Sequence, residues 1–350
     1  MKDPLRHALA VLQRGVDDGA IPGAVVHVRK EGEPLLRTAV GTLDGTLPAR
    51  LDSRYDLASL TKPLATASTL VALAGRGELL LSASIADFLG PSAESHRAVT
   101  VRHLLTHTSG LPSWMACYEN GTGLDAAVDA ILRRPALVPE QQYEYSCLGY
   151  ILLAKIVEVV AGEPLDRVAD RLVFQKYGLK SLGFRPGPAA DIAPTISREG
   201  NDPALPVRLH GVVHDGNARA IEAAGRSVSG NAGLFGNVDD VALFGDLCLG
   251  RPGRKGRRWS GPVRYQFLHE SSRPFGHTLA FFAYSNPLVP RGDLFTDQTV
   301  GHSGYTGTAL LIDWMNDTTV AVLTNAVYGD GKERWLAVRR RFMNAVAAGI

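Results

Sequence analysis

The fold is decided by one stretch, Tyr55-Asp56-Leu57-Ala58-Ser59-Leu60-Thr61-Lys62-Pro63, which opens an apolar segment that predicts a helix over residues 59–75. A serine and a lysine three positions apart on a helix lie on the same face, about one turn apart. If Ser59 begins the helix, its hydroxyl sits at the positive end of the helix dipole. Of the eight lysines in the chain, only Lys62 has a serine three residues before it.

This pair of residue types can supply a nucleophile together with its base. A serine hydroxyl needs a neighbouring group that takes its proton before it can attack a carbonyl. A buried lysine has its pKa lowered by desolvation, so that it can accept a proton. We therefore predict that Ser59 is a catalytic nucleophile and that Lys62 is its partner. The alternative is that Ser59 caps a helix and Lys62 is a surface residue.

A second candidate motif, Tyr145-Ser146-Cys147, comes directly before a segment that predicts a helix over residues 147–161. A phenol held near an ammonium ionises more easily, because the positive charge favours the phenolate. Tyr145 could then carry the proton from the nucleophile to the leaving group. The alternative is a packed tyrosine before a helix, with Cys147 as a buried structural thiol or, in a further variant, as the nucleophile itself.

A third motif is rich in glycine and lies just before a strand predicted over residues 308–314; it reads Gly301-His302-Ser303-Gly304-Tyr305-Thr306-Gly307. Glycine allows the backbone to approach a ligand closely. Backbone N–H groups of this stretch could join that of Ser59 in an oxyanion hole. The alternative is a simple turn that leads into the strand.

Around these motifs, the two ends of the chain predict one sheet and the middle predicts helices. Helices are expected over residues 4–19, 99–107, 123–133, 147–161 and 332–348, strands over 24–28, 35–40, 308–314 and 318–324, and a surface loop over 186–206. Asn316-Asp317 marks a tight hairpin turn. The pattern predicts an α+β fold, an antiparallel sheet flanked by helices with an inserted helical domain. Residues 1–64 and 211–350 form the sheet domain, residues 65–210 form the helical domain, and the active site lies between them.

The amino-acid composition and net charge of the chain limit the classes of binding partner that we expect. The 350 residues carry a formal charge of +2, with 45% hydrophobic and 21% charged residues, which suits a soluble protein and gives no reason to expect nucleic acid. Cys117, Cys147 and Cys248 are odd in number and widely spaced, so we expect reduced thiols. No signal-peptide core and no transmembrane run is visible, and we expect a cytoplasmic protein that does not bind membranes.

The three motifs, in the order S-x-x-K, Y-S-x and H-x-G, resemble the serine β-lactamase and penicillin-binding-protein family, most closely its class C β-lactamase-related branch. That branch also contains D-aminoacyl peptidases and carboxylesterases. Residues 104–112, 145–153, 210–215 and 232–235 agree with this resemblance. It implies the β-lactamase/transpeptidase-like fold, an acyl-enzyme on Ser59, and a small ester, amide or β-lactam substrate. Neither a cofactor nor a metal is expected.

The resemblance also assigns roles to single residues. Ser59 matches the nucleophile, Lys62 the neighbouring lysine, and Tyr145 the general base and acid. The backbone N–H groups of Ser59 and Tyr305 match the oxyanion hole. The remaining matches imply contacts with substrate, at Cys147, His302, Ser303 and Gly304.

One residue departs from the family pattern. The second motif normally ends in asparagine, and Cys147 stands there. A thiol is a weak donor and a weak acceptor, and an unpaired substrate group costs about 1–3 kcal/mol. The departure disfavours efficient β-lactam or peptide turnover and leaves ester hydrolysis open. Three hypotheses remain. The first, which we rank highest, is a β-lactamase-type hydrolase, and the second is a carboxylesterase or D-aminoacyl peptidase. The third is a penicillin-binding homologue that binds a substrate without hydrolysing it.

Two further patterns carry weaker signals. The pairs His103/His107 and His210/His214 have a spacing that can bind zinc, but neither has the H-E-x-x-H pattern, and we favour packing or capping roles. A basic cluster could bind phosphate or nucleic acid; it consists of Arg251, Arg254, Lys255, Arg257 and Arg258. We interpret this cluster as a solvated loop, because Trp259 is the one aromatic residue beside it that could stack.

Overall fold

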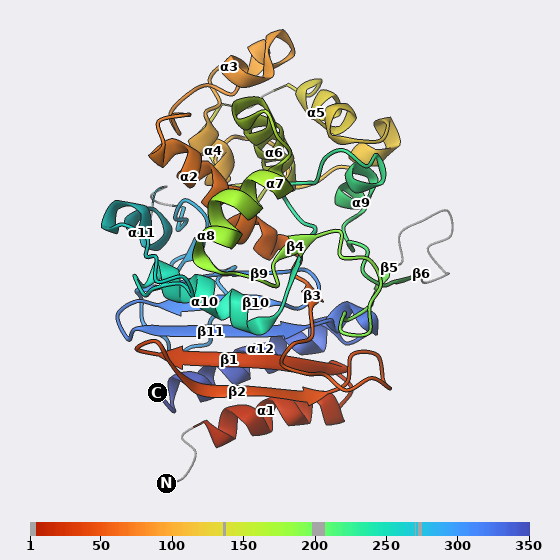
Figure 1. Cartoon of the computed structure of the whole chain (residues 1–350), viewed down its shortest axis with the longest axis vertical. Coiled ribbons are helices and arrows are strands. Elements are labelled where there is room, and N and C mark those ends of the chain that lie inside the picture. The colour runs from red at the N-terminus through yellow and green to blue at the C-terminus, as the bar shows by residue number, and fades with distance from the viewer. Residues whose placement is uncertain (1–4, 136–137, 198–206, 270, 272–274) are drawn as a thin grey trace.

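The computed structural model describes residues 5–135, 138–197, 207–269, 271 and 275–350. A six-stranded antiparallel sheet has the strand order β2-β1-β11-β10-β9-β8 (Figure 1). Its strands are β1 (Gly23–Lys30), β2 (Glu33–Gly41), β8 (Phe282–Ala283), β9 (Thr299–Ser303), β10 (Ala309–Asp313) and β11 (Thr318–Thr324). Both ends of the chain build this sheet, which confirms the prediction of an α+β fold.

Helices cover both faces of the sheet. One face packs against α1 (Arg6–Asp17) and α12 (Lys332–Ala347), and the other packs against α10 (Val238–Cys248). Alternate residues of β1, namely Ala24, Val26 and Val28, share a buried apolar cluster with α1 and α12. Val25 belongs to the cluster on the opposite face, because successive side chains of a strand point to opposite sides. All residues of β11 are buried, as a strand covered on both faces requires.

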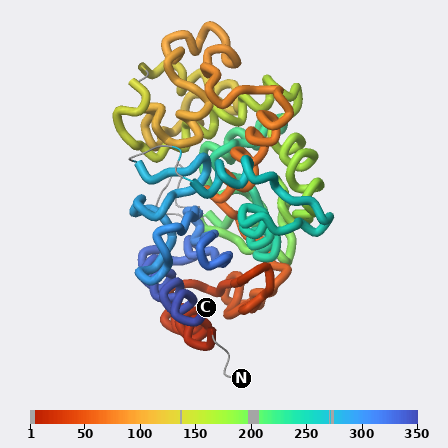
Figure 2. The backbone as a smooth tube through the Cα atoms, turned by 90° about the vertical axis from the view of Figure 1, so that its left-hand side faces the viewer, coloured from red at the N-terminus to blue at the C-terminus, as the bar shows by residue number. Residues whose placement is uncertain are grey.

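The other helices gather mainly beyond the β9 side of the sheet, at the end of the molecule farthest from α1 (Figures 1 and 2). They are α2 (Ser68–Gly75), α3 (Ala86–Leu89), α4 (Val101–Leu105), α5 (Leu124–Leu132), α6 (Cys147–Ala161), α7 (Leu165–Ala169), α8 (Gln175–Tyr177), α9 (Gly216–Ala223) and α11 (Gly261–Leu268). One buried cluster contains Val25 and Leu310 of the sheet as well as Ile151 of α6, so the sheet and the helices share a continuous core. The predicted domain boundaries near residues 64 and 210 stay predictions.

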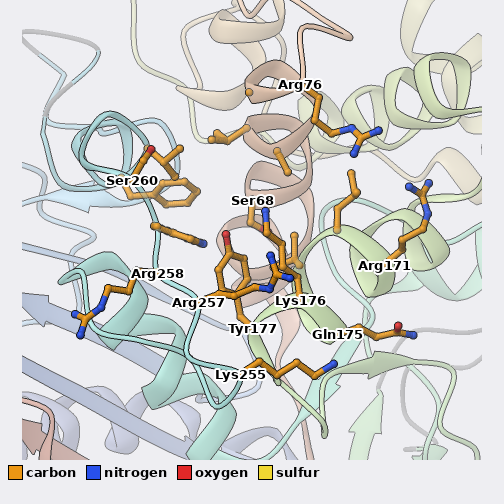
Figure 3. A pocket seen from close by; sticks show the side chains of 18 residues that line it. Ser68, Arg76, Arg171, Gln175, Lys176, Tyr177, Lys255, Arg257, Arg258 and Ser260 are labelled. Carbon is orange, nitrogen blue, oxygen red and sulfur yellow. The ribbon is translucent and has the colours of Figure 1, made fainter.

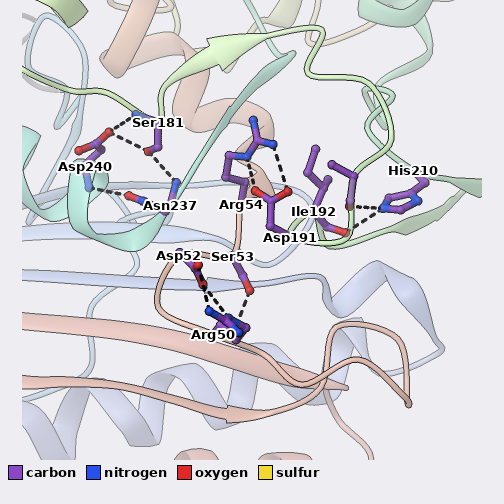
Figure 4. A network of polar contacts seen from close by, with 11 residues as sticks. Arg50, Asp52, Ser53, Arg54, Ser181, Asp191, Ile192, His210, Asn237 and Asp240 are labelled. Carbon is purple, nitrogen blue, oxygen red and sulfur yellow. Dashed lines mark hydrogen bonds and ion pairs between the residues drawn. The ribbon is translucent and has the colours of Figure 1, made fainter.

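Two small sheets connect these parts. The first has the order β3-β7-β4, from β3 (Tyr55–Asp56), β7 (Leu234–Gly236) and β4 (Gly183–Phe184), and the second pairs β5 (Thr195–Ser197) with β6 (Val207–Leu209). Polar contacts hold the chain around β3 (Figure 4). Arg54, just before β3, forms an ion pair with Asp191 at 2.7 Å, and Ser181 donates to Asp240 at 2.7 Å. These contacts fix the strand that leads into Ser59.

Several local predictions differ from the structure. Residues 59–75 do not form one α-helix: a 3-10 helix (Ala58–Leu60) is followed by a π-helical turn (Lys62–Ala67) and then by α2. Pro63 has no N–H to donate back to the Ser59 carbonyl, so regular α-helical bonding cannot begin there. The glycine-rich motif begins within β9 itself, and the predicted loop contains β5, while residues 198–206 lie outside the described residues.

In the part of the chain that the structure describes, no helix combines the length and the apolar character that crossing a membrane would require.

Candidate active site

Ser59 and Lys62 contact each other directly. The Lys62 ammonium donates to the Ser59 hydroxyl oxygen, with 3.1 Å between Nζ and Oγ. It also donates to the Asn231 carbonyl at 3.0 Å and lies 3.4 Å from the Cys147 sulfur. Lys62 is fully buried, so the alternative of a surface lysine is wrong. A buried ammonium with three acceptors is satisfied, and one of those acceptors is the predicted nucleophile.

Tyr145 completes this group. The Lys62 nitrogen lies 5.0 Å from the centroid of the Tyr145 ring, and Tyr145 lines the same cavity as Ser59. Burial raises the pKa of Tyr145, and the nearby Lys62 charge opposes this effect without cancelling it. The phenol is therefore neutral in the resting site. This differs from the expectation that the ammonium would promote a phenolate.

The pKa of Lys62 also differs from the expectation. Burial lowers it, but the negative forms of Cys147 and Tyr145 raise it more, so the pKa of Lys62 lies above its usual value of 10.5. The prediction of a lowered lysine pKa is therefore wrong. At neutral pH the site holds an ammonium and a neutral phenol, and a base appears when one proton leaves the pair.

The turn that carries Ser59 is held by a buried carboxylate. One Asp56 oxygen accepts from the Ala58 N–H at 2.8 Å, and the other accepts from the His214 N–H at 2.7 Å. Ala58 has a φ of 48°, a conformation that non-glycine residues adopt at a cost. Burial raises the pKa of Asp56 to about 6. The surrounding structure thus fixes a strained turn next to the predicted nucleophile.

The β9–β10 connection presses against the same turn. The Thr306 hydroxyl donates to the Asp56 carbonyl at 2.8 Å, and the Thr308 hydroxyl donates to the Leu57 carbonyl at 3.1 Å. A Cβ at Gly304 would lie 2.6 Å from the Leu57 carbonyl oxygen, closer than real contacts allow. Glycine is therefore required at this position so that the first and third motifs can meet.

Two backbone N–H groups are available at this junction. In the described part of the chain, the N–H groups of Ser59 and Tyr305 have no hydrogen-bond acceptor, and both residues line the same cavity. Unpaired donors that converge on a cavity are what an oxyanion hole needs. The assignment of these two groups to that role stays a prediction.

The second motif is positioned by the start of α6. Ser146 caps this helix by accepting from the Gly149 N–H at 3.2 Å, and its hydroxyl donates to the Pro112 carbonyl at 2.7 Å. The Ser146 N–H donates to Nδ1 of His107 at 3.0 Å, and the His107 ring packs 4.5 Å from that of Tyr145. His107 therefore supports Tyr145 from behind. The sequence did not indicate this role, because His107 stood out there only as part of the His103/His107 pair considered for zinc.

Of the predicted substrate contacts, Ser303 and Gly304 line the cavity that contains Ser59 and Tyr145. His302 is only 1% exposed and stacks on Phe282 at 4.6 Å, so its ring lies behind the cavity surface. Cys147 lies against the Lys62 ammonium. Direct contact of these side chains with a substrate remains a prediction.

The cavity has a volume of about 690 Å³ and a positively charged wall. Four cationic residues line it, Arg291, Lys332, Arg339 and Arg340, and no aspartate or glutamate is among the described residues that do so. Three of the four come from α12, spaced so that one face of the helix meets the cavity. Arg340 is paired with Asp293 at 3.0 Å.

The other histidines of the two candidate zinc pairs, His103, His210 and His214, have local partners. Nδ1 of His103 accepts from the Thr100 N–H at 3.2 Å, and Nε2 of His210 lies 2.9 Å from the Ala189 carbonyl (Figure 4). His214 stacks on Tyr305 at 5.5 Å. Among the described residues, no group of three or more His, Cys, Asp or Glu side chains could hold a metal ion. Cys117, Cys147 and Cys248 are free thiols.

Comparisons with known proteins agree with this arrangement. The family model described as Beta-lactamase matches residues 9–341. Esterase EstB of Burkholderia gladioli is 30% identical over 91% of this chain and 90% of the esterase, and an N-acetylmuramyl-L-alanine amidase of Bacillus subtilis is 28% identical over 92% of this chain and 80% of the amidase.

Solved structures show the same fold. EstCE1, a hydrolase with promiscuous acyltransferase activity, superposes with a TM-score of 0.77 at 22% identity, over 99% of both chains. A class C β-lactamase from Rhodobacter sphaeroides superposes with a TM-score of 0.72 at 21% identity, over 95% of this chain and 97% of that one. The sequence match over nearly the whole chain, together with the Ser59–Lys62 contact, shows that the chain belongs to the Beta-lactamase family of serine hydrolases.

Proposed function

We propose that this protein hydrolyses carboxylic esters through an acyl-enzyme on Ser59. The observation that carries the proposal is the hydrogen bond between the buried Lys62 ammonium and the Ser59 hydroxyl, beside the Tyr145 phenol. A hydroxyl held next to two groups that exchange protons can become a nucleophile without a metal. Ser59, Lys62 and Tyr145 are the residue types that the family motifs have at these three positions.

In the mechanism that follows, the Lys62–Tyr145 pair first loses one proton to solvent and so becomes a base. Ser59 Oγ then attacks the ester carbonyl while its proton passes to this pair. The backbone N–H groups of Ser59 and Tyr305 stabilise the negative oxygen that forms. Tyr145 then protonates the departing alkoxide, and the acyl group stays on Ser59. Water attacks the acyl-enzyme by the same route in reverse, which releases the acid and restores the serine.

Cys147 favours esters over β-lactams as substrates. Its sulfur lies 3.4 Å from the Lys62 ammonium and offers weak hydrogen bonding to a substrate amide. An ester lacks the amide N–H and has a better leaving group, so it demands less of this position. The similarity to Esterase EstB agrees with this choice. Hydrolysis of β-lactams in the class C manner, or of D-aminoacyl peptides, is the second candidate on the same scaffold.

The charged wall of the cavity indicates the kind of ester. Arg339 is half-buried, burial lowers its pKa to about 10, and its buried Nε has no hydrogen-bond partner in the described structure. A cation with an unpaired buried N–H is stabilised by an anion that enters the cavity. We expect substrates whose acyl part carries a carboxylate at some distance from the scissile ester.

A side-by-side turnover assay tests the proposal, with a short-chain nitrophenyl ester, a chromogenic cephalosporin and a D-aminoacyl nitroanilide, each against Ser59→Ala. We expect ester turnover that Ser59→Ala abolishes, and slow or stalled reaction with the cephalosporin. Fast cephalosporin turnover would show a β-lactamase, and absence of reaction with all three would favour a binding protein. The cytoplasmic location stays a prediction, for which cell fractionation is the test.

A further inference from the structure

A second cavity of about 690 Å³ lies between α2, α8 and the start of α11, and shares no lining residue with the cavity around Ser59 (Figure 3). Its floor is buried and largely apolar, with side chains of Val71, Val173, Trp259 and Phe267. Its rim is exposed and basic. The rim consists of Arg76, Arg171, Lys176, Lys255, Arg257 and Arg258, and no aspartate or glutamate lines the cavity among the described residues.

Two of the six cations are neutralised by nearby carboxylates outside the cavity. Arg76 pairs with Glu78, and Arg171 pairs with Glu163 at 2.9 Å. These pairs place the guanidinium groups on one side of the cavity, opposite the loop before α11 (Figure 3).

The other four cations have no carboxylate partner among the described residues. They are Lys176, Lys255, Arg257 and Arg258, of which Arg258 donates to the Gly250 carbonyl at 2.7 Å. The rest of the basic cluster is occupied elsewhere, because Arg251 pairs with Asp317 and Arg254 with Asp240. The interpretation of the whole cluster as a solvated loop is therefore too simple: part of it converges with α8 on one cavity.

Tyr177 adds a neutral donor to this site. It is 7% exposed, and its ring packs edge-on against that of Trp259, with 6.2 Å between the ring centroids. A phenol O–H can donate to an anionic oxygen. The Lys176 nitrogen lies 5.3 Å from the centroid of the Tyr177 ring, which brings this donor and a free cation to the same side of the cavity.

We propose that this cavity binds a small polyanion that carries a di- or triphosphate group. Four uncompensated cations around one cavity repel one another, in a chain whose formal charge is only +2. One monoanion leaves most of that repulsion in place, whereas a triphosphate carries about as many charges as the site. Guanidinium groups also bind phosphate oxygens in pairs. The apolar floor leaves room for an organic part attached to the phosphates.

Calorimetric titration of the full chain with inorganic tripolyphosphate tests the proposal, at constant ionic strength and with sulfate as a reference anion. We expect saturable 1:1 binding, and a melting temperature that keeps rising with the logarithm of the ligand concentration once this exceeds the dissociation constant. The variant Lys255→Ala/Arg257→Ala should bind roughly tenfold more weakly or worse, because two charge-assisted contacts are lost. The control Arg133→Ala/Arg134→Ala removes the same charge at the exposed end of α5 and should bind like the wild type.

Ester hydrolysis by each variant shows whether it is folded, and Arg257→Gln alone repeats the test with a smaller change. A second titration with ATP identifies the source of the phosphates: tighter binding than tripolyphosphate indicates a nucleotide, and equal binding indicates the phosphate chain itself. Either result supports the site. Absence of saturable binding, or equal weakening in the Arg133/Arg134 control, would overturn it.

Discussion

Lys62 carries its charge in a fully buried position, where an ammonium must be surrounded by acceptors. The serine and lysine spacing predicted that Ser59 and Lys62 would meet, because it depends only on local geometry. The Asn231 carbonyl and the His107 ring could not be predicted, since they reach the site through contacts between residues far apart in sequence. Cys147, the residue that departs from the family pattern, contacts the same ammonium. We propose that it sets the preference among substrates.

Cys147→Asn should raise cephalosporin turnover relative to ester turnover. An asparagine amide can accept and donate where the thiol does so weakly, and one restored contact corresponds to roughly tenfold in rate. The ratio of the two kcat/KM values measures this effect. Cys248→Ala, which changes a buried thiol away from the site, is the control. An unchanged ratio in Cys147→Asn would show that the thiol does not limit β-lactam turnover.

Arg339→Gln should weaken the binding of acidic esters only. Loss of one charge-assisted contact raises KM for a nitrophenyl succinate half-ester roughly tenfold, while KM for the neutral butyrate ester stays the same. Arg341→Gln is the matched control, because Arg341 is exposed on the same helix and does not line the cavity. Equal changes for both esters would remove the argument for an acidic acyl group.

At the scale of elements, the long periodic segments were predictable and the segments at the site were not. The sequence predicts α6 and β11 with the bounds that the structure has, because each is a largely apolar segment. Nine of the 15 residues of α6 and all seven residues of β11 are buried. The break of the helix after Ser59 depends on Pro63 and on contacts with Thr306 and Thr308, more than 240 residues away. Such contacts leave no local pattern in the sequence.

Gly304→Ala should reduce both stability and turnover. The added Cβ would collide with the Leu57 carbonyl and push the β9–β10 connection away from the Ser59 turn. We expect a loss of about 1–3 kcal/mol in the free energy of unfolding and a fall in kcat. Urea unfolding and ester kinetics measure the two effects. Gly261→Ala, where a Cβ meets open space, should change neither; wild-type kinetics in Gly304→Ala would mean that the close approach is unimportant.

At the scale of the whole molecule, the sheet joins the two ends of the chain, and the helices between them extend its core. The strands predicted at both ends of the chain, with helices predicted between them, anticipated this arrangement. The buried carboxyls could not be predicted from the sequence. Burial raises the pKa of Glu222, on α9, to about 8, and its Oε1 has no hydrogen-bond partner among the described residues.

Glu222 should make the wild type less stable as the pH rises. Its folded-state pKa of about 8 exceeds its usual value of 4.5, so its stabilising effect is complete below pH 4.5 and is lost as the pH rises through 8. Relative to Glu222→Gln, the free energy of unfolding should fall by about 1.4 kcal/mol per pH unit between pH 5 and 8. Urea unfolding at several pH values measures the difference. The exposed Glu33→Gln variant should track the wild type, and a parallel profile for Glu222→Gln would contradict the assignment.

The proposed mechanism requires that Ser59 becomes acylated. Its most direct test is mass spectrometry of the intact protein and of its peptides, after the reaction with a nitrophenyl ester is stopped with acid. We predict a mass increase of one acyl group, located on Ser59 and absent from Ser59→Ala. An acyl group on Cys147, or an adduct that persists in Ser59→Ala, would contradict the account.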